Sequence, residues 1–440
     1  MIGHEPTSRT LPFLAQACRG GLALLGGLCA SWATAAVITV QPGQSIQVAI
    51  DQAAPGDTVE VLRGRYVENL RIEKTLTLRG IDRPTVSGGD KGDTIRVTAP
   101  DVVIEGMIVA DSGGSLRDQN AGIYIQPGAH RAKVQNCFLN YNLFGLWIEK
   151  ADDVQVLGNN ITGKRDFDSA QRGNGVQLYN TKGARIVGNR VSFVRDALYI
   201  DVSHHAVFKQ NRLHHSRYGT HYMNSYYNLW EDNDTWDNRG GLALMEVRNQ
   251  EIRNNRAWKN SDHGIMLRTL QDAVIEGNIV MNNGRGLFIY DVEYTTLTGN
   301  VVAENRIGVH LSGSARNKVD DNDFIENHEQ IRYGSTRDTR WGGDKGNYWS
   351  NYRGWDRDAD GRGDIPYEAN DVVDRLTWRY PSVRLLLASP AVQALRMVGQ
   401  QFPLLRVPSV VEQHPRMLPR STDWARWRAR LNKKEADHAP

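Results

Sequence analysis

The sequence predicts an all-β fold, a right-handed parallel β-helix, from three features of residues 122–330. A glycine followed by alternating apolar residues recurs every 22 or 23 residues, with one interval of 30. The apolar residues alternate with period two, as in a β-strand with one buried face. An asparagine follows 14 residues after each repeat start. Short strands separated by turns, one coil per repeat, describe a parallel β-helix, and parallel strands favour right-handed crossovers. The repeats start at Gly122, Gly145, Gly175, Ala197, Gly219, Gly241, Gly264, Gly286 and Gly308.

The asparagines are expected to form ladders, because stacked coils bring equivalent side chains about 4.8 Å apart. Such side chains can hydrogen-bond along the stack and satisfy buried backbone groups in the turns. The first predicted ladder is Asn136, Asn159, Asn189, Asn211, Asn233, Asn255, Asn278, Asn300 and Asn322. The second is Asn238, Asn260, Asn283, Asn305 and Asn327.

The N-terminus, residues 1–36, is predicted to be an export signal peptide. Arg9 and Arg19 supply positive charge, residues 20–30 form an apolar run, and residues 33–35 read Ala-Thr-Ala, a small-residue cleavage site. The apolar run is shorter than the roughly 20 residues that span a bilayer. We therefore expect the mature chain to lie outside the cytoplasm.

The β-helix is expected over residues 37–350, closed at its N-terminal end by a short helix. Residues 45–51 have helical spacing, with Ile46, Ala49 and Ile50 on one face. A Pro-Gly-Asp turn follows at residues 55–57 and precedes the first predicted strands, at 58–62 and 75–78. The interval of 30 holds about eight extra residues near 163–172, which we expect to form a surface loop and a candidate contact element.

Composition excludes several classes of protein. Of the 440 residues, 40 % are hydrophobic and 23 % charged, so the chain can bury a core. The net charge of +3 argues against a protein that binds nucleic acid by charge alone. Cys18 and Cys29 lie in the predicted signal peptide, which leaves Cys137 alone and excludes a disulfide scaffold or a zinc finger.

A copper site is predicted on one outward face of the repeat. Residues two and four positions after each repeat start point outward, and these positions bring together His221, Met223, Met245 and Met266. Thioether and imidazole groups suit Cu(I) and do not suit calcium or magnesium. The alternative is an apolar protein-contact patch, for which methionine is also suited.

An aspartate-rich segment, residues 351–380, follows the repeat. Asp356, Asp358, Asp360 and Asp364 surround a glycine and resemble the first half of a calcium loop. Tyr367 stands at the twelfth position, where a calcium loop has an acidic ligand. A structural calcium site and a solvated turn remain as alternatives.

The C-terminal segment, residues 381–440, is basic, with ten Lys or Arg against four Asp or Glu. Residues 421–423 could cap a helix that carries Trp424, Trp427 and Leu431 on one side. Such a basic, tryptophan-bearing helix suits a membrane surface or an acidic partner. We expect this tail to dock on a membrane partner, and not on the β-helix core.

A polysaccharide-active enzyme is the alternative function, a lyase or hydrolase, or else a carbohydrate-binding protein. Glu149 and Asp201 share one outward column two coils apart, about 9.6 Å by strand spacing. Inverting glycosidases use carboxylates roughly 6.5–9.5 Å apart. Tyr124, Trp147 and Tyr199 could stack on sugars beside them.

The chain resembles the NosD family. The resemblance rests on the helical cap at 44–51, the 22-residue coils, the Gly-Asn-Tyr-Trp-Ser segment at 346–350 and the aspartate-rich segment that ends in Ile-Pro-Tyr at 365–367. The resemblance implies a periplasmic, non-enzymatic protein of copper-site assembly in nitrous oxide reductase, a denitrification enzyme. It implies that the protein works with an ABC transporter, NosFY, a copper chaperone, NosL, and the reductase. From the histidine and methionine positions we expect copper to bind transiently, and from the net charge we expect no nucleic acid partner.

Overall fold

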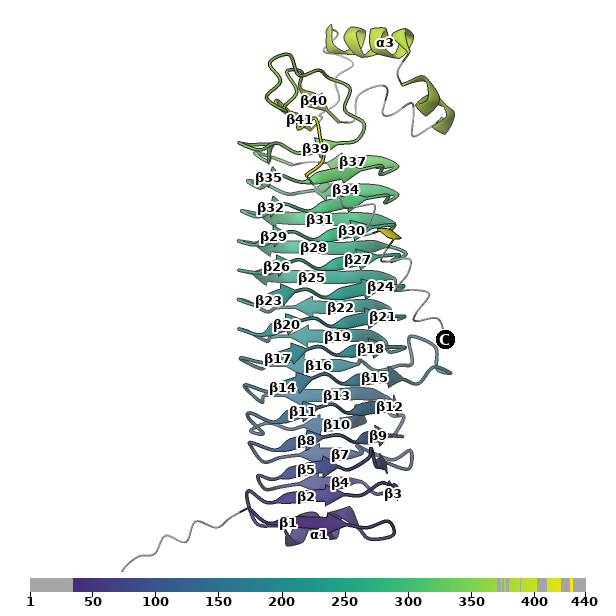
Figure 1. Cartoon of the computed structure of the whole chain (residues 1–440), viewed down its shortest axis with the longest axis vertical. Helices are drawn as coiled ribbons and strands as arrows, with labels where there is room; N and C mark the ends of the chain where they lie inside the picture. The colour runs from purple at the N-terminus through teal and green to yellow at the C-terminus, as the bar shows by residue number, and fades with distance from the viewer. Residues whose placement is uncertain are drawn as a thin grey trace, which may run out of the picture. The chain divides into compact units, whose positions relative to one another are not determined.

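The computed structural model describes residues 35–334, 336–369, 373, 376, 380–387, 389–401, 410–420 and 428–429. The chain winds into stacked coils, each of which gives one strand to each of three parallel sheets (Figure 1). From β2 onward, each strand of the coils pairs with the strand three positions later. The predicted all-β parallel β-helix is thereby confirmed. The predicted signal peptide, apart from residues 35 and 36, lies outside the described residues.

The bounds of the strands follow the order of each sheet. The 14-stranded sheet consists of β1 (Val37–Val40), β2 (Thr58–Val61), β5 (Thr77–Gly80), β8 (Val103–Glu105), β11 (Lys133–Gln135), β14 (Gln155–Leu157), β17 (Arg185–Val187), β20 (Val207–Lys209), β23 (Leu229–Glu231), β26 (Glu251–Arg253), β29 (Val274–Glu276), β32 (Thr296–Thr298), β35 (Lys318–Asp320) and β38 (Arg340–Trp341). The 13-stranded sheet consists of β3 (Arg65–Val67), β6 (Thr85–Ser87), β9 (Ile108–Ala110), β12 (Phe138–Asn142), β15 (Asn160–Gly163), β18 (Arg190–Ser192), β21 (Arg212–His214), β24 (Asp234–Trp236), β27 (Arg256–Trp258), β30 (Ile279–Met281), β33 (Val301–Ala303), β36 (Asp323–Ile325) and β39 (Tyr348–Trp349). The 12-stranded sheet consists of β4 (Leu70–Ile72), β7 (Ile95–Val97), β10 (Ala121–Ile125), β13 (Phe144–Glu149), β16 (Val176–Tyr179), β19 (Asp196–Asp201), β22 (Tyr218–Met223), β25 (Gly240–Arg248), β28 (His263–Gln271), β31 (Arg285–Glu293), β34 (Ile307–Ser312) and β37 (Glu329–Gly334).

The core is the interior of the coils, filled by the inward members of each alternating strand. In β28, for example, Ile265 and Leu267 are fully buried. Aromatic side chains continue the stacking from coil to coil, as where the rings of Phe208 and Trp230 lie 4.0 Å apart and nearly parallel. Burial of each large apolar side chain contributes about 1.5–3 kcal/mol, so the repeat stabilises itself coil by coil.

The asparagine ladders form as predicted, with one correction. In the first ladder, the amide oxygen of each asparagine from Asn159 to Asn322 accepts the backbone N–H of the ladder residue one coil earlier, as from Asn233 to Asn255 at 3.0 Å. The inclusion of Asn136 was wrong, because Cys137 occupies the ladder position in that coil. Asn136 is exposed and has a φ of 53°, and the next coil has a glycine, Gly158, at the equivalent position. The second ladder runs through all five predicted asparagines.

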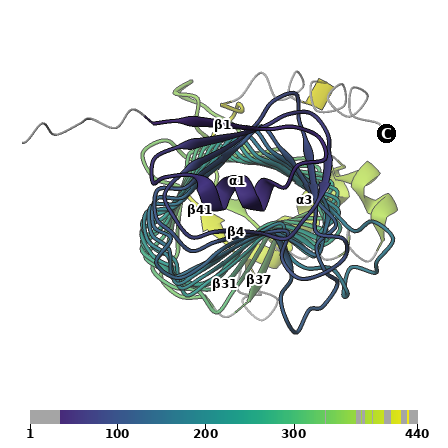
Figure 2. The same ribbon diagram turned by 90° about the horizontal axis from the view of Figure 1, so that it is seen from below.

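A helix covers the N-terminal end of the coils. In α1 (Ile46–Gln52), Ile46, Ala49 and Ile50 are buried, as predicted, and Figure 2 shows the helix lying across the end of the stack. Ser45 caps the helix by accepting the backbone N–H of Val48. These contacts remove the first coil's apolar interior from water.

The C-terminal end is covered by a segment far along the chain, which the sequence did not predict. Strand β41 (Val411–Glu412) pairs with β40 (Tyr367–Glu368), and the buried Glu412 carboxylate accepts hydrogen bonds from the backbone N–H of Asn347 at 2.6 Å and from the indole N–H of Trp349 at 2.7 Å. Asn347 is itself the next member of the first ladder, so Glu412 ends that ladder. The expectation that the tail does not dock on the β-helix core is therefore wrong for residues 410–420. It is also wrong for Arg428, whose guanidinium lies 3.2 Å from the Glu304 carboxylate in the coils.

Between residues 381 and 401, the described tail contains the 3-10 helix η1 (Pro381–Leu386) and α3 (Pro390–Gln401). None of the helices in the described part of the chain has the length and apolar character needed to cross a membrane. Trp424, Trp427 and Leu431 of the predicted amphipathic helix lie outside the described residues.

Candidate functional site

The predicted copper ligands lie on three adjacent strands of the 12-stranded sheet. Met223, on β22, pairs directly with Met245, on β25. His221 pairs with Ala243, which in turn pairs with Met266 on β28. The four side chains therefore surround Ala243 on one outward face, with the two paired methionines about 4.8 Å apart along the stack. We call this group the histidine–methionine patch.

The patch is more enclosed than the outward position of its residues suggests. Ala243 is fully buried, and Met266 is 8 % exposed. Met223, Met245 and His221 are half-buried. A small residue between larger ones on a pleated surface is covered by its neighbours, since adjacent coils are only about 4.8 Å apart. The result is a partly dry surface of soft donors, in which water competes weakly for a metal.

His221 is oriented by a buried carboxylate. Its Nδ1 lies 3.1 Å from an oxygen of Asp196, which is fully buried and also accepts a hydrogen bond of 2.9 Å from the Arg217 Nε. Burial alone would raise the pKa of Asp196, but the hydrogen bonds from His221 and Arg217 lower it below its usual value. An ionised Asp196 accepts the Nδ1 proton of the imidazole and leaves the Nε2 lone pair for a ligand.

Two tyrosine rings pack around the same histidine. The Tyr199 ring meets His221 edge-on at 4.9 Å between centroids, and Tyr218 lies 5.5 Å away. Asp196 and Tyr218 were not predicted from the sequence, although both occupy one position, the first residue of their strand, in successive coils. That shared position was the available signal.

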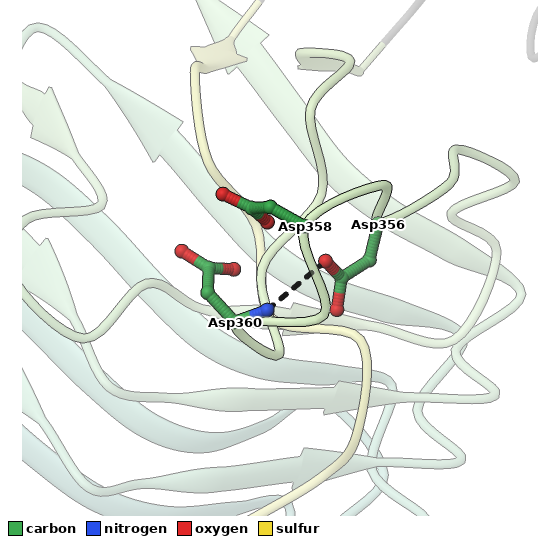
Figure 3. A group of neighbouring side chains, drawn as sticks. All are labelled: Asp356, Asp358 and Asp360. Atoms are coloured by element: carbon green, nitrogen blue, oxygen red, sulfur yellow. Dashed lines mark hydrogen bonds between the residues drawn. The ribbon is translucent and has the colours of Figure 1, made fainter.

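The aspartate-rich segment forms a compact loop that brings three of its four predicted ligands together. Carboxylate oxygens of Asp356, Asp358 and Asp360 all lie within 4.8 Å of one another (Figure 3). The Asp356 carboxylate already accepts the backbone N–H groups of Asp360, at 3.2 Å, and Gly361, at 2.8 Å. Asp364 lies outside this group and accepts the backbone N–H of Arg357.

The carboxylates of the alternative sugar-active site stand as the spacing predicts, two coils apart. Glu149 pairs with Tyr179, and Tyr179 pairs with Asp201. The exposed Tyr179 side chain therefore stands between the two carboxylates in the column. Glu149 also accepts a hydrogen bond of 2.7 Å from the Tyr124 hydroxyl.

The rings of Trp236 and Trp258, which pair on adjacent strands, stack with centroids 5.0 Å apart. Four histidines close to these strands, His204, His205, His214 and His215, differ in exposure. His214 is buried and stacks on Trp236 at 4.4 Å, while His205 and His215 are exposed. The difference follows from β21, whose last residue is His214 and places it beside that tryptophan.

Comparisons with solved structures agree with the fold. The chain is similar to the A-module of the mannuronan C-5 epimerase AlgE6 of Azotobacter vinelandii, with a TM-score of 0.54 and 16 % identity over 68 % of this chain and 93 % of that chain. It is also similar to the Dettilon tailspike protein, with a TM-score of 0.53 and 12 % identity over 64 % of this chain and 62 % of that chain. At these identities the likeness extends to the fold alone.

Sequence comparisons go further. Two curated relatives, each named "Probable ABC transporter binding protein NosD", match over 80 % of this chain: that of Stutzerimonas stutzeri at 37 % identity over 85 % of its length, and that of Pseudomonas aeruginosa at 38 % over 86 %. The family model described as "Periplasmic copper-binding protein (NosD)" matches residues 157–354, a range that contains the whole histidine–methionine patch. The chain therefore belongs to the NosD family of periplasmic copper-binding proteins.

Proposed function

We propose that this protein is a periplasmic accessory protein for assembly of the copper sites of nitrous oxide reductase, and that it carries Cu(I) transiently on the histidine–methionine patch. The observation that carries the proposal is the pairing of Met223 with Met245, beside a histidine whose Nδ1 faces a buried carboxylate. Thioether sulfur and imidazole nitrogen favour Cu(I), and few strong donors allow release as well as binding.

The proposed partners are an ABC transporter, NosFY, the copper chaperone NosL and the reductase itself. The names of the two relatives support the transporter. The family resemblance supplies the rest. In this proposal the protein is not an enzyme, it reaches the periplasm by its signal peptide, and the part of its basic tail that does not pack on the coils contacts the membrane or the transporter.

Competition for Cu(I) with a coloured chelator tests the copper role. Replacing both Met223 and Met245 by leucine keeps bulk and removes the sulfur atoms, so we expect a loss of at least about tenfold in affinity. Met397→Leu, at an exposed methionine on α3, is the matched control and should bind as the unchanged protein does. Unchanged affinity in the double variant would make the patch a protein-contact surface.

We also propose a structural calcium ion in the aspartate-rich loop. The support is the gathering of the Asp356, Asp358 and Asp360 carboxylates, since calcium prefers several oxygen ligands. Calcium should raise the melting temperature, and Asp358→Asn should abolish that rise.

A further inference from the structure

An arginine-rich pocket lies beside the loop inserted between β15 and β16. It has a volume of about 410 Å³, within the range of small-molecule sites. Four of its eight lining residues are arginines, and none is acidic. The lining is Ser169, Ala170, Arg172, Arg195, His215, Ser216, Arg217 and Arg239. We call it the arginine pocket.

Three of these arginines repeat from coil to coil. Arg195, Arg217 and Arg239 each stand immediately before a strand of the 12-stranded sheet, on three successive coils. The backbone N–H of Arg217 donates to the carbonyl of Arg195 at 2.8 Å, as expected for neighbouring coils. Like charges on adjacent strands destabilise a sheet. A bound anion would remove that repulsion.

The positive charges are only partly balanced. Asp196 pairs with Arg217. Within the part of the chain that the structure describes, the Arg195 and Arg239 side chains make neither an ion pair nor a hydrogen bond. Arg172 donates to the neutral carbonyls of Phe167 and Arg165, both at 2.8 Å, so these hydrogen bonds do not neutralise its charge.

The wall formed by the inserted loop is held in place by several contacts. The buried Lys164 ammonium donates to the carbonyl of Ser112 at 3.2 Å, and the Tyr141 hydroxyl donates to Asp166 at 2.6 Å. The Arg165 guanidinium lies over the Phe193 ring at 4.1 Å. The pocket is thus built before a ligand arrives, which lowers the entropic cost of binding.

We propose that the arginine pocket binds an oxyanion, a phosphate or carboxylate group on a small molecule. Guanidinium groups match both in a two-pronged hydrogen-bond geometry, and Arg195 and Arg239 have their donors available. The pocket has room for several such groups, so a ligand with more than one negative charge suits it best. The proposal does not rest on the copper role, because its test measures anion binding alone.

Titration calorimetry of the full chain with inorganic phosphate and with citrate, at constant ionic strength, tests the proposal and distinguishes phosphate from carboxylate. We expect saturable binding of at least one anion. Replacing Arg195 and Arg239 together by glutamine should weaken it by at least about tenfold, since each removes a charged hydrogen bond. The double variant Arg195→Lys with Arg239→Lys keeps the charge but not the two-pronged geometry. Its anion affinity should lie between that of the unchanged chain and that of the double glutamine variant.

The matched control is Arg190→Gln with Arg212→Gln. These arginines also pair on successive coils, but they lie on the 13-stranded sheet, away from the pocket lining. This control should bind the anion within about twofold of the unchanged chain. Arg239 is exposed, so Arg239→Gln alone keeps the test valid if the double variant misfolds. Failure of both anions to bind, or an equal loss in the control, would overturn the proposal.

Discussion

The proton on the Nδ1 atom of His221 links the proposed copper ligand to the protein interior. Because Asp196 accepts that proton and Arg217 holds Asp196, the imidazole ring is fixed in one orientation. Carboxylates that orient a metal-binding histidine in this way affect metal affinity without touching the metal.

We therefore predict that Asp196→Asn weakens Cu(I) binding by about 10–100-fold, because an amide accepts the imidazole proton less strongly. Chelator competition measures the loss, and circular dichroism checks that the fold survives the change beside Arg217. Asp272→Asn, at an exposed turn, is the control and should leave affinity unchanged. Equal Cu(I) affinities in the unchanged chain and the two variants would show that Asp196 does not affect copper binding.

Glu412 is a second buried carboxylate, and its environment acts in the opposite direction. Burial raises its pKa from 4.5 to about 6, although hydrogen bonds from Asn347 and Trp349 oppose the shift. The folded state therefore binds a proton more tightly than the unfolded state does. The stabilising contribution of that proton is complete below about pH 4.5 and is lost as the pH rises through about 6.

At low pH the full effect is about 2 kcal/mol, because folding raises the pKa of Glu412 from 4.5 to about 6. Denaturant unfolding at pH 5 and pH 7 measures it in the unchanged protein and in Glu412→Gln, which keeps the shape without the titrating group. The difference between the two proteins should change by about 1 kcal/mol between the two pH values, because part of the stabilisation is already lost at pH 5. A constant difference would contradict the prediction.

At the scale of elements, the asparagine ladders hydrogen-bond neighbouring coils at the turns, where the strands make no backbone pairing. Asn255 accepts from the backbone N–H and the amide of Asn233 and donates to the carbonyl of Trp230. Its removal would leave several buried polar groups without partners.

We predict that Asn255→Ala lowers the free energy of unfolding by about 2–4 kcal/mol, because each buried polar group without a partner costs about 1–3 kcal/mol. Asn136→Gly is the control, since Asn136 is exposed and glycine accepts its positive φ. Denaturant unfolding should show almost no change in that variant. A similar loss in both would mean that the ladder adds nothing beyond the local backbone.

The strands, the ladders and the helical cap were predictable because the residues that form each of them recur at a fixed spacing in the sequence. Asn136 was misplaced because a period counted from the glycines ignores a one-residue shift within a coil. The contact between Glu412 and Asn347 was not predictable, since the two residues are 65 positions apart and no repeat relates them. Asp196 was missed because Asp196 and Arg217 both precede the repeat starts of their coils, outside the outward columns that contain His221.

For the whole molecule, the stack of coils should lose stability from its ends, since each coil contacts only its neighbours. Truncation after Pro381 removes Glu412 and leaves buried donors of Asn347 and Trp349 without their acceptor. We predict faster hydrogen exchange in residues 320–350 and unchanged protection in residues 60–300.

The same truncation tests the proposed docking of the tail, since the remaining β-helix should no longer co-purify with its membrane partner. A point variant, Glu412→Ala, separates the two effects: it should loosen the last coil while keeping the tail. Co-purification of the truncated protein would place the docking surface on the coils.

Because the coils pair regularly, the distance between two sites on one sheet follows from the number of coils between them. Strand β22, which carries His221 and Met223, lies five pairings from β37, the last strand of its sheet, or about 24 Å along the stack. Deleting residues 278–299 would remove one period and join Gly277 to Asn300, so that the ladder continues. The histidine–methionine patch would then lie about 4.8 Å nearer to the C-terminal end of the stack, on the same sheet. The number of coils therefore fixes the distance between the proposed copper site and a partner bound at the C-terminal end of the stack.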